Sequence, residues 1–327
     1  MPDMRIDPAR ASLVTLVSML RQQLDAGATT LELTVADPDR GAGRYAGQPV
    51  AVGGEALVHR PFRTWVDLAE RLGLRLHTPR PAAAAGRVVL TFTKLGPEPG
   101  WARGDGDDPT ERYGAGSGYQ RISKAEDPGF VLDLADALER VGLPAAPRVL
   151  DLGVNTGDEL ALMMELRPEL RAATFVGVDH SASALRVAAE RLGDARHRFV
   201  RADLGALPQL DLGERFDLVL SIGTLHSPGV DDRAVLRHVV QERLRARGGV
   251  VIGVPNCSYR DGEVVHGAKM KNFSQPDLSL LVKSVAFYRR YLHQHRRKVY
   301  VTGKHYVLVT GVAGSAEAKG GEGEGVG

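Results

Sequence analysis

The stretch VLDLGVNTGDE (149–159) constrains the fold of this chain more than any other. The apolar residues around Asp151 indicate a buried strand, and Gly153, Asn155 and Gly157 indicate a tight turn. The residues that follow, LALMMELRP, predict a helix. A strand, a glycine turn and a helix form the first half of a nucleotide-binding βαβ unit, so the sequence predicts a nucleotide-type ligand at this turn.

The patterns on either side of this unit indicate how the chain is organised. Helix and strand patterns alternate from about residue 129 to about residue 252, which predicts a doubly wound α/β sheet. The stretch 97–128 is rich in Gly, Pro and Asp and carries aromatic residues that could close over a ligand. The expected domains are an N-terminal α+β accessory domain (1–96), a linker or lid loop (97–128), the α/β domain (129–313) and a disordered tail (314–327).

Bulk composition narrows the classes of function. The net charge is only +2, so no global field favours nucleic acid or an anionic membrane. Cys257 is the single cysteine, which excludes an internal disulfide. No stretch approaches the roughly 20 apolar residues of a membrane span. The first residues also lack the pattern of a signal peptide, and a cytoplasmic protein without membrane partners is expected.

The acidic residues at the strand ends discriminate between nucleotide ligands. A carboxylate at Asp151 would repel a diphosphate, and the glycine spacing of a dinucleotide site is absent. A ligand with positive charge and no phosphate fits better, and S-adenosylmethionine is such a ligand. Asp179 ends the next strand, where it could accept both ribose hydroxyls. Asp203 ends a third strand, where it could accept a hydrogen bond from an adenine amino group.

Five segments then follow one another in a familiar order. VLDLGVNTG, FVGVDHS, VRADLGALP, FDLVLSIGTLH and LRARGGVVIGVP resemble the class I S-adenosylmethionine-dependent methyltransferases over about residues 130–313. The resemblance implies S-adenosylmethionine as cofactor and a Rossmann-like seven-stranded sheet. It also implies a closing antiparallel hairpin, which KVYVTGKHYVLVTGV would supply.

The resemblance assigns residues to each part of the cofactor. The methionine end falls to the glycine turn, the ribose to the second acid and the adenine to the third. The residues so implied are Asp151, Gly153 and Gly157 for methionine, Asp179 for ribose, and Asp203 with Leu204 for adenine, with His180 and Ser221 alongside. Asn155 departs from the pattern, because the commonest residue there is glycine. Asn tolerates left-handed backbone angles and would add a side-chain amide facing the ligand.

One histidine is the candidate catalytic residue. His226 follows the fourth strand and resembles the first histidine of the LHH found at this point in many small-molecule methyltransferases. Its neutral imidazole could act as a base near pH 7, or the side chain could cap the next helix or pack on the cofactor. Cys257 lies in NCS, similar to the TCS of RNA cytosine-5 methyltransferases, but their Pro-Cys after strand four is missing here. A packing role is therefore preferred for Cys257, and no metal site is expected.

The acceptor is left open by the sequence. The unusually long segment after strand five could bind it through Asn256, Tyr259, Arg260, Glu263, His266, Lys269 and Lys271. Residues 278–316 carry seven Lys or Arg and no acid, with Phe287, Tyr288 and Tyr291 among them, which could hold RNA. The sequence predicts transfer of a methyl group to an unidentified acceptor, with a small molecule preferred over RNA. The alternative is a non-catalytic S-adenosylmethionine-binding regulatory protein.

Overall fold

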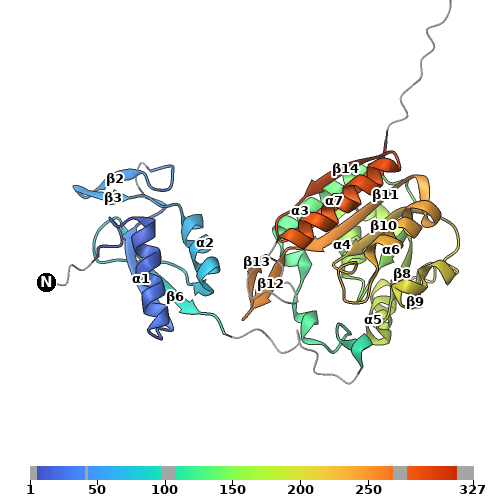
Figure 1. Cartoon of the computed structure of the whole chain (residues 1–327), viewed down its shortest axis with the longest axis horizontal. Helices are drawn as coiled ribbons and strands as arrows, with labels where there is room; N and C mark the ends of the chain where they lie inside the picture. The colour runs from blue at the N-terminus through green and yellow to red at the C-terminus, as the bar shows by residue number, and fades with distance from the viewer. Residues whose placement is uncertain (1–5, 41–42, 97–107, 268–277, 315–327) are drawn as a thin grey trace, which may run out of the picture. The chain divides into compact units, whose positions relative to one another are not determined.

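The computed structural model describes residues 6–40, 43–96, 108–267 and 278–314. The chain divides into two compact units (Figure 1). The first comprises residues 1–99 and 259–265, and the second comprises residues 100–258 and 266–327.

The first unit is a small antiparallel sheet with helices on one face. Its strand order is β1-β6-β4, with β5 also paired to β6. Alternate residues of the strands, such as Leu33 and Phe92, pack with Leu20 and Trp65 of the helices. The elements are α1 (Leu13–Asp25), β1 (Thr30–Ala36), β2 (Pro49–Val52), β3 (Glu55–Val58), α2 (Phe62–Leu72), β4 (Leu74–Leu76), β5 (Arg80–Pro81) and β6 (Arg87–Lys94).

A late segment of the chain completes this unit. Residues 259–265 run from the end of β12 (Cys257–Arg260) through most of β13 (Glu263–His266), and these two strands pair with each other. Arg75 Nε donates to Glu263 Oε1 at 2.8 Å, and Arg260 Nε donates to the carbonyl of Gly96 at 2.8 Å. The first unit is thus built from two stretches that lie far apart in the sequence.

The second unit is built on a seven-stranded sheet in the order β14-β15-β11-β10-β7-β8-β9. The strands from β11 to β9 are parallel, and β15 runs antiparallel to both β11 and β14. The sheet and its closing hairpin confirm the predicted class I fold. The strands are β7 (Arg148–Leu152), β8 (Thr174–Asp179), β9 (Arg198–Arg201), β10 (Phe216–Ile222), β11 (Leu244–Pro255), β14 (Arg297–Thr302) and β15 (Tyr306–Ala313).

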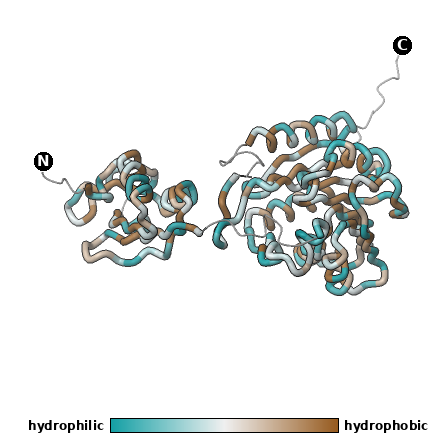
Figure 2. Tube along the Cα trace, turned by 60° about the horizontal axis from the view of Figure 1, so that its bottom comes forward, coloured by the Kyte–Doolittle hydropathy of each residue, from teal (hydrophilic) through white to brown (hydrophobic). Residues whose placement is uncertain are grey.

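Helices cover both faces of this sheet. One apolar cluster joins α3 (Pro128–Val141), α4 (Asp158–Leu166) and α5 (Ala182–Leu192) to one face. The other cluster joins α6 (Asp232–His238) and α7 (Ser279–Gln294) to the opposite face. Nearly all residues of the central strands are buried, as expected for parallel strands covered on both sides. Figure 2 shows hydrophobic residues running through the second unit. Shorter helical segments are η5 (Pro168–Ala172), η6 (Leu204–Gln209) and the π-helical η7 (Val239–Arg243).

Residues 108–126 contain three single-turn 3-10 helices in place of a plain loop. They are η2 (Pro109–Glu111), η3 (Gly118–Arg121) and η4 (Lys124–Glu126). Residues 97–107 and most of the predicted tail lie outside the described residues, so the predicted domain boundaries stay a proposal.

Candidate active site

The turn after β7 has the backbone that its sequence predicts. Gly153 and Gly157 have φ of 84° and 78°, and Asn155 has φ of 46°, in the region that favours glycine and asparagine. A Cβ atom on Gly153 would collide with the side chain of Thr224, which follows β10. The glycine is therefore required both by its φ and by the close approach of the neighbouring strand end.

Asp151 is a buried acid, and one of its carboxyl oxygens receives no hydrogen bond from the described residues. Its side chain lies at the end of β7 with 2 % exposure, and its Oδ2 has no hydrogen-bond partner among the described residues. Burial, together with the charge of Glu159 nearby, raises the pKa of Asp151 well above its ordinary range. A buried carboxyl group without a partner fits a ligand that brings its own positive charge, such as an ammonium group.

A second buried acid beside it is paired by the protein itself. Lys124 of η4 forms an ion pair with Glu159 of α4, and its ammonium lies 6.0 Å from the ring centroids of both Tyr119 and Tyr306. Burial alone would lower the pKa of Lys124, but the charge of Glu159, the neighbouring Tyr119 and Tyr306, and the hydrogen bond to Glu159 together raise it above the ordinary lysine value, so the lysine is cationic. The site therefore holds one satisfied acid and one acid that still needs a partner.

Asp179 ends β8 at the same edge of the sheet. Its Oδ2 accepts from the backbone N–H of Asn155 at 2.9 Å, and its Oδ1 accepts from that of Ser181 at 2.9 Å. A carboxylate oxygen has more than one lone pair, so each oxygen keeps capacity for a ribose hydroxyl. His180 lies next to it, half-buried, and its carbonyl accepts from Arg201 Nε at 3.1 Å.

The remaining predicted cofactor residues differ in their surroundings. Asp203 is exposed beyond β9, and its Oδ1 accepts from Gly205 N–H at 2.6 Å. Leu204 beside it is buried. Ser221 is also buried, and its hydroxyl donates to the carbonyl of Leu152 at 3.1 Å, which links β10 to β7. Its side chain is thus engaged within the sheet.

His226 follows the end of β10 and is exposed to solvent. Its ring meets the ring of Tyr288 of α7 edge to face, with centroids 6.0 Å apart. The Tyr288 hydroxyl donates to Asp232 Oδ2 at 2.7 Å. Desolvation by the surrounding protein lowers the pKa of His226, so the imidazole is neutral at pH 7.

Residues 108–126 bring further side chains to this edge of the sheet, which the sequence motifs did not indicate. Glu111 accepts from the backbone N–H groups of Ala182 and Ser183 at 2.9 and 3.3 Å, at the start of α5. Gln120 Nε2 donates to Asn155 Oδ1 at 2.7 Å, and Lys124 pairs with Glu159. These residues lie in an irregular Gly-rich stretch where no periodicity points to a partner.

Cys257 and the residues predicted to bind the acceptor lie in several different surroundings. Burial raises the pKa of the Cys257 thiol to about 12, which disfavours a thiolate nucleophile. Asn256 is buried and its Nδ2 donates to the carbonyl of Lys304 at 2.9 Å. Tyr259, Arg260 and Glu263 belong to the first unit, His266 to the second, and Lys269 and Lys271 lie outside the described residues.

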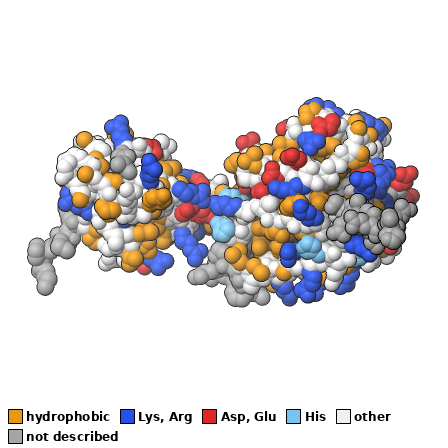
Figure 3. Space-filling view, turned by 90° about the horizontal axis from the view of Figure 1, so that it is seen from above, with side chains coloured by type: hydrophobic (Ala, Val, Ile, Leu, Met, Phe, Trp, Pro, Cys, Tyr) orange, Lys and Arg blue, Asp and Glu red, His pale blue; other side chains and the backbone are white. Residues whose placement is uncertain are grey.

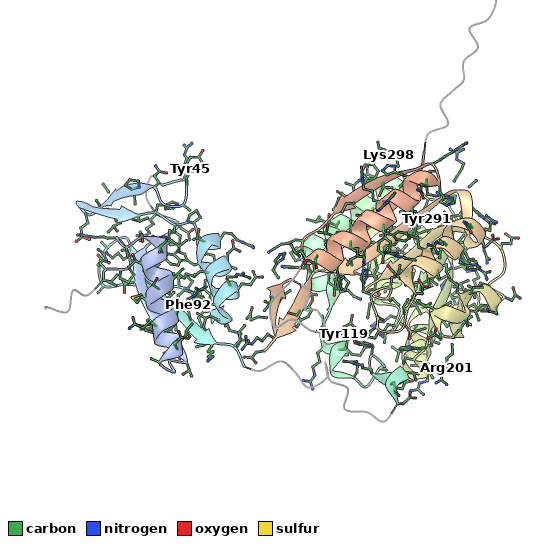
Figure 4. All side chains as sticks on the ribbon, viewed as in Figure 1. Tyr45, Phe92, Tyr119, Arg201, Tyr291 and Lys298 are labelled. Atoms are coloured by element: carbon green, nitrogen blue, oxygen red, sulfur yellow. The ribbon has the colours of Figure 1, made fainter. Side chains whose placement is uncertain are left out.

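Several side chains of the basic stretch near the C-terminus that were candidates to contact RNA are buried in the core. Tyr288 and Tyr291 are 0 % and 9 % exposed. Arg297 is buried and donates to the carbonyls of Gly248, Arg245 and Ala246. In Figure 4, Tyr291 lies on α7, whereas Lys298 lies on β14.

Two general features of the described residues bear on the kind of protein. No helix among them is long and apolar enough to cross a membrane. Within the same ranges, no group of three or more His, Cys, Asp or Glu side chains is placed to hold a metal ion.

Comparison with known proteins identifies the second unit. Residues 150–251 match the family model of a methyltransferase domain. Streptomyces venezuelae DesVI is similar in structure, with 19% identity over 59% of this chain and 93% of that chain and a TM-score of 0.39. An S-adenosylmethionine-dependent methyltransferase from Thiobacillus denitrificans in complex with S-adenosyl-L-homocysteine shares 21% identity over 55% of this chain and 68% of that chain, with a TM-score of 0.36.

A third structure is a chain of a complex that contains the Haloferax volcanii Trm112 methyltransferase activator. It shares 15% identity over 60% of this chain and 94% of that chain, with a TM-score of 0.40.

The matched domain, the seven-stranded sheet and the acidic strand ends define the class I S-adenosylmethionine-dependent methyltransferases. Residues 150–251 form a methyltransferase domain, and S-adenosylmethionine is its cofactor. The unpaired buried oxygen of Asp151 fits the cationic methionine end of that cofactor, and the free capacity of Asp179 fits its ribose.

Proposed function

We propose that this methyltransferase modifies a small-molecule acceptor and that His226 acts as the base for acceptors that must lose a proton. The observation that carries the proposal is the position of His226, at the carboxyl end of β10 and neutral at pH 7. In a parallel α/β sheet, ligands bind at the carboxyl ends of the strands, and His226 follows the strand end at the same edge of the sheet as Asp151 and Asp179.

Different residues bind the cofactor and act on the acceptor. S-adenosylmethionine supplies an electrophilic methyl group on its sulfonium when bound. We infer that Asp151 binds the ammonium group, Asp179 the ribose, and Asp203 with Leu204 the adenine. Because the sulfonium is already a good leaving group, positioning of the acceptor supplies most of the rate. His226 would take a proton from the acceptor, while contact with the Tyr288 ring limits its movement.

The C-terminal basic stretch supports a small molecule over RNA. Non-specific RNA binding relies on exposed aromatic rings as well as cations. Here two of the three aromatic side chains and Arg297 are buried. Figure 3 also shows basic and acidic side chains interspersed on the face of the second unit that it presents. Arg289, Arg290, Arg296 and Lys298 remain exposed, but without the buried rings and Arg297 they make a weaker site.

The acceptor class is tested with labelled S-adenosylmethionine and fractionated cell extract. We expect the labelled methyl group in the low-molecular-mass fraction and not in RNA. Label in RNA that disappears in an Arg289→Ala/Arg290→Ala variant would instead support the RNA alternative. Cofactor binding with no transfer to any fraction would support the regulatory alternative.

The role of His226 is tested with the acceptor so found. His226→Asn should lower kcat by about 10²- to 10⁴-fold if the histidine is the base. His293→Asn, at an exposed histidine of α7, is the matched control and should leave kcat unchanged. Because the pKa of His226 lies below 6.5, the activity of the unmodified enzyme should fall only as the pH drops below that value. A His226→Asn variant with undiminished kcat would rule out base catalysis.

A further inference from the structure

The segment 108–126 crosses the edge of the sheet at which the cofactor residues lie. It contacts the start of α5, next to Asp179, then the glycine turn after β7, and then Glu159 of α4. Its course therefore passes the ribose position first and the methionine position second. Figure 4 shows Tyr119 of this segment on its ribbon.

Asn155 holds the middle of this segment. Its Nδ2 donates to the carbonyl of Tyr113 at 2.7 Å, and its Oδ1 accepts from Gln120 Nε2 at 2.7 Å. Gln120 Nε2 also donates to the same Tyr113 carbonyl at 3.0 Å, and Asn155 Oδ1 accepts from Thr156 N–H at 2.9 Å. A glycine at this position, which the common pattern has, would keep the turn but make neither side-chain bond.

Glu111 holds the first end of the segment. Beside its two backbone bonds it accepts from the hydroxyl of Ser181 at 2.8 Å and from that of Ser183. Hydrogen bonds from Ser183 lower the pKa of Glu111, so the group is a carboxylate at neutral pH. The negative charge suits the N-terminus of α5, where backbone N–H groups point outward.

Gly114 shows how tightly this end is packed. A Cβ atom there would lie 2.6 Å from Ser183 Oγ and would also collide with the Glu111 carboxylate. Two residues further on, a Cβ atom on Gly116 would meet nothing within 4 Å. The two glycines thus offer a disruptive and a harmless substitution within one segment.

We propose that Asn155 is a positioning residue that fastens residues 108–126 as a cover over the methionine and ribose parts of the cofactor site. With the cover fastened, cofactor exchange requires the cover to open. The acceptor then approaches from the side of β10 and β11, where His226 lies. The side chain of Asn155, which a glycine would lack, thus holds the cover, while its backbone N–H still donates to Asp179.

The test measures binding of S-adenosylhomocysteine and so needs no acceptor. Asn155→Gly keeps the φ of the turn, because glycine adopts positive φ readily. Losing the two side-chain bonds should speed dissociation of S-adenosylhomocysteine roughly tenfold, since each such bond stabilises the closed cover by a factor of about two to twelve. Stopped-flow displacement gives this rate, and Gly114→Ala should act in the same direction.

Limited trypsin digestion reports on the cover itself. In the unmodified protein, S-adenosylhomocysteine should slow cleavage after Arg121 and Lys124. In Asn155→Gly this protection should be lost, whereas Gly116→Ala should behave like the unmodified protein. If Gly114→Ala fails to fold, Asn155→Gly and Gln120→Ala still decide the matter.

Unchanged dissociation and unchanged protection in folded Asn155→Gly and Gln120→Ala would overturn the proposal. The cofactor assignment is judged separately, by whether the unmodified protein binds S-adenosylhomocysteine at all. The small-molecule and base proposals are judged only by the transfer assays. Failure of the cover therefore stays distinguishable from failure of the proposed function.

Discussion

Asp151 lies among buried charges that do not balance. Asp151, Glu159 and Asp179 are all acids with less than 10 % exposure, and Lys124 is the one cation paired among them. The raised pKa of Asp151 indicates that a proton makes up the difference in the protein alone. An ammonium group from the cofactor would replace that proton.

This exchange predicts that cofactor binding releases a proton. Between the ordinary Asp pKa of 3.8 and the raised value, the free protein holds the proton and the complex does not, so affinity should increase with pH across that window. Calorimetry in buffers of different ionisation enthalpy should show release of about one proton with S-adenosylhomocysteine. Methylthioadenosine, which lacks the ammonium group, should release none. Proton release that persists in Asp151→Asn would contradict this assignment.

Asp179 is the proposed ribose ligand, and it also holds the turn by accepting from the backbone N–H of Asn155. Asp179→Ala should weaken S-adenosylhomocysteine binding by about ten- to a hundredfold, because hydrogen bonds to a charged acceptor contribute roughly 1.5–3 kcal/mol. Asp136→Ala, at an exposed acid of α3, is the control and should bind normally. Equal affinities for the two variants in a calorimetric titration would exclude Asp179 from the site.

Among the elements, β14 is tied to β11 through one arginine. Arg297 donates to three carbonyls between residues 245 and 248, and burial lowers the pKa of its guanidinium. Arg297→Ala should lower the free energy of unfolding by about 1–3 kcal/mol, because three carbonyls, among them that of buried Gly248, lose a donor. Arg290→Ala, at an exposed site, should leave denaturant unfolding unchanged. A stable Arg297→Ala variant with weakened RNA binding would restore this residue to a phosphate-binding role.

An element can be predicted from sequence when the residues that form it lie close together in the chain. The strands ending at Asp151 and Asp179 carry apolar runs, and Ser181 caps α5 as expected, with its hydroxyl accepting from Ala184 N–H at 3.1 Å. The hairpin of β2 and β3 was missed, because its short strands lie in a Gly-rich stretch. The contacts of Glu111 and Gln120 join residues 35 to 72 positions apart, and no local pattern encodes them. The acid positions were predictable from the strand ends, whereas their partners were not.

For the whole molecule, the described site residues all belong to the second unit. A chain that begins at residue 100 should therefore fold and bind S-adenosylhomocysteine with unchanged affinity, since each unit has its own apolar core. Calorimetry on the shortened chain checks this, and Asp179→Ala in the same chain is the negative control. Loss of binding in a folded shortened chain would mean that the first unit takes part in holding the cofactor.

The split composition of the first unit has a consequence for synthesis on the ribosome. Its own sheet and core are encoded before residue 99, yet residues 259–265, which supply partners for Arg75 and Gly96, come 160 residues later (259 − 99). At translation rates of about 5–20 residues per second, the early part waits roughly 8–32 s for them. During that interval the nascent domain must persist on its core alone, with the guanidinium of Arg75 and the carbonyl of Gly96 turned to water.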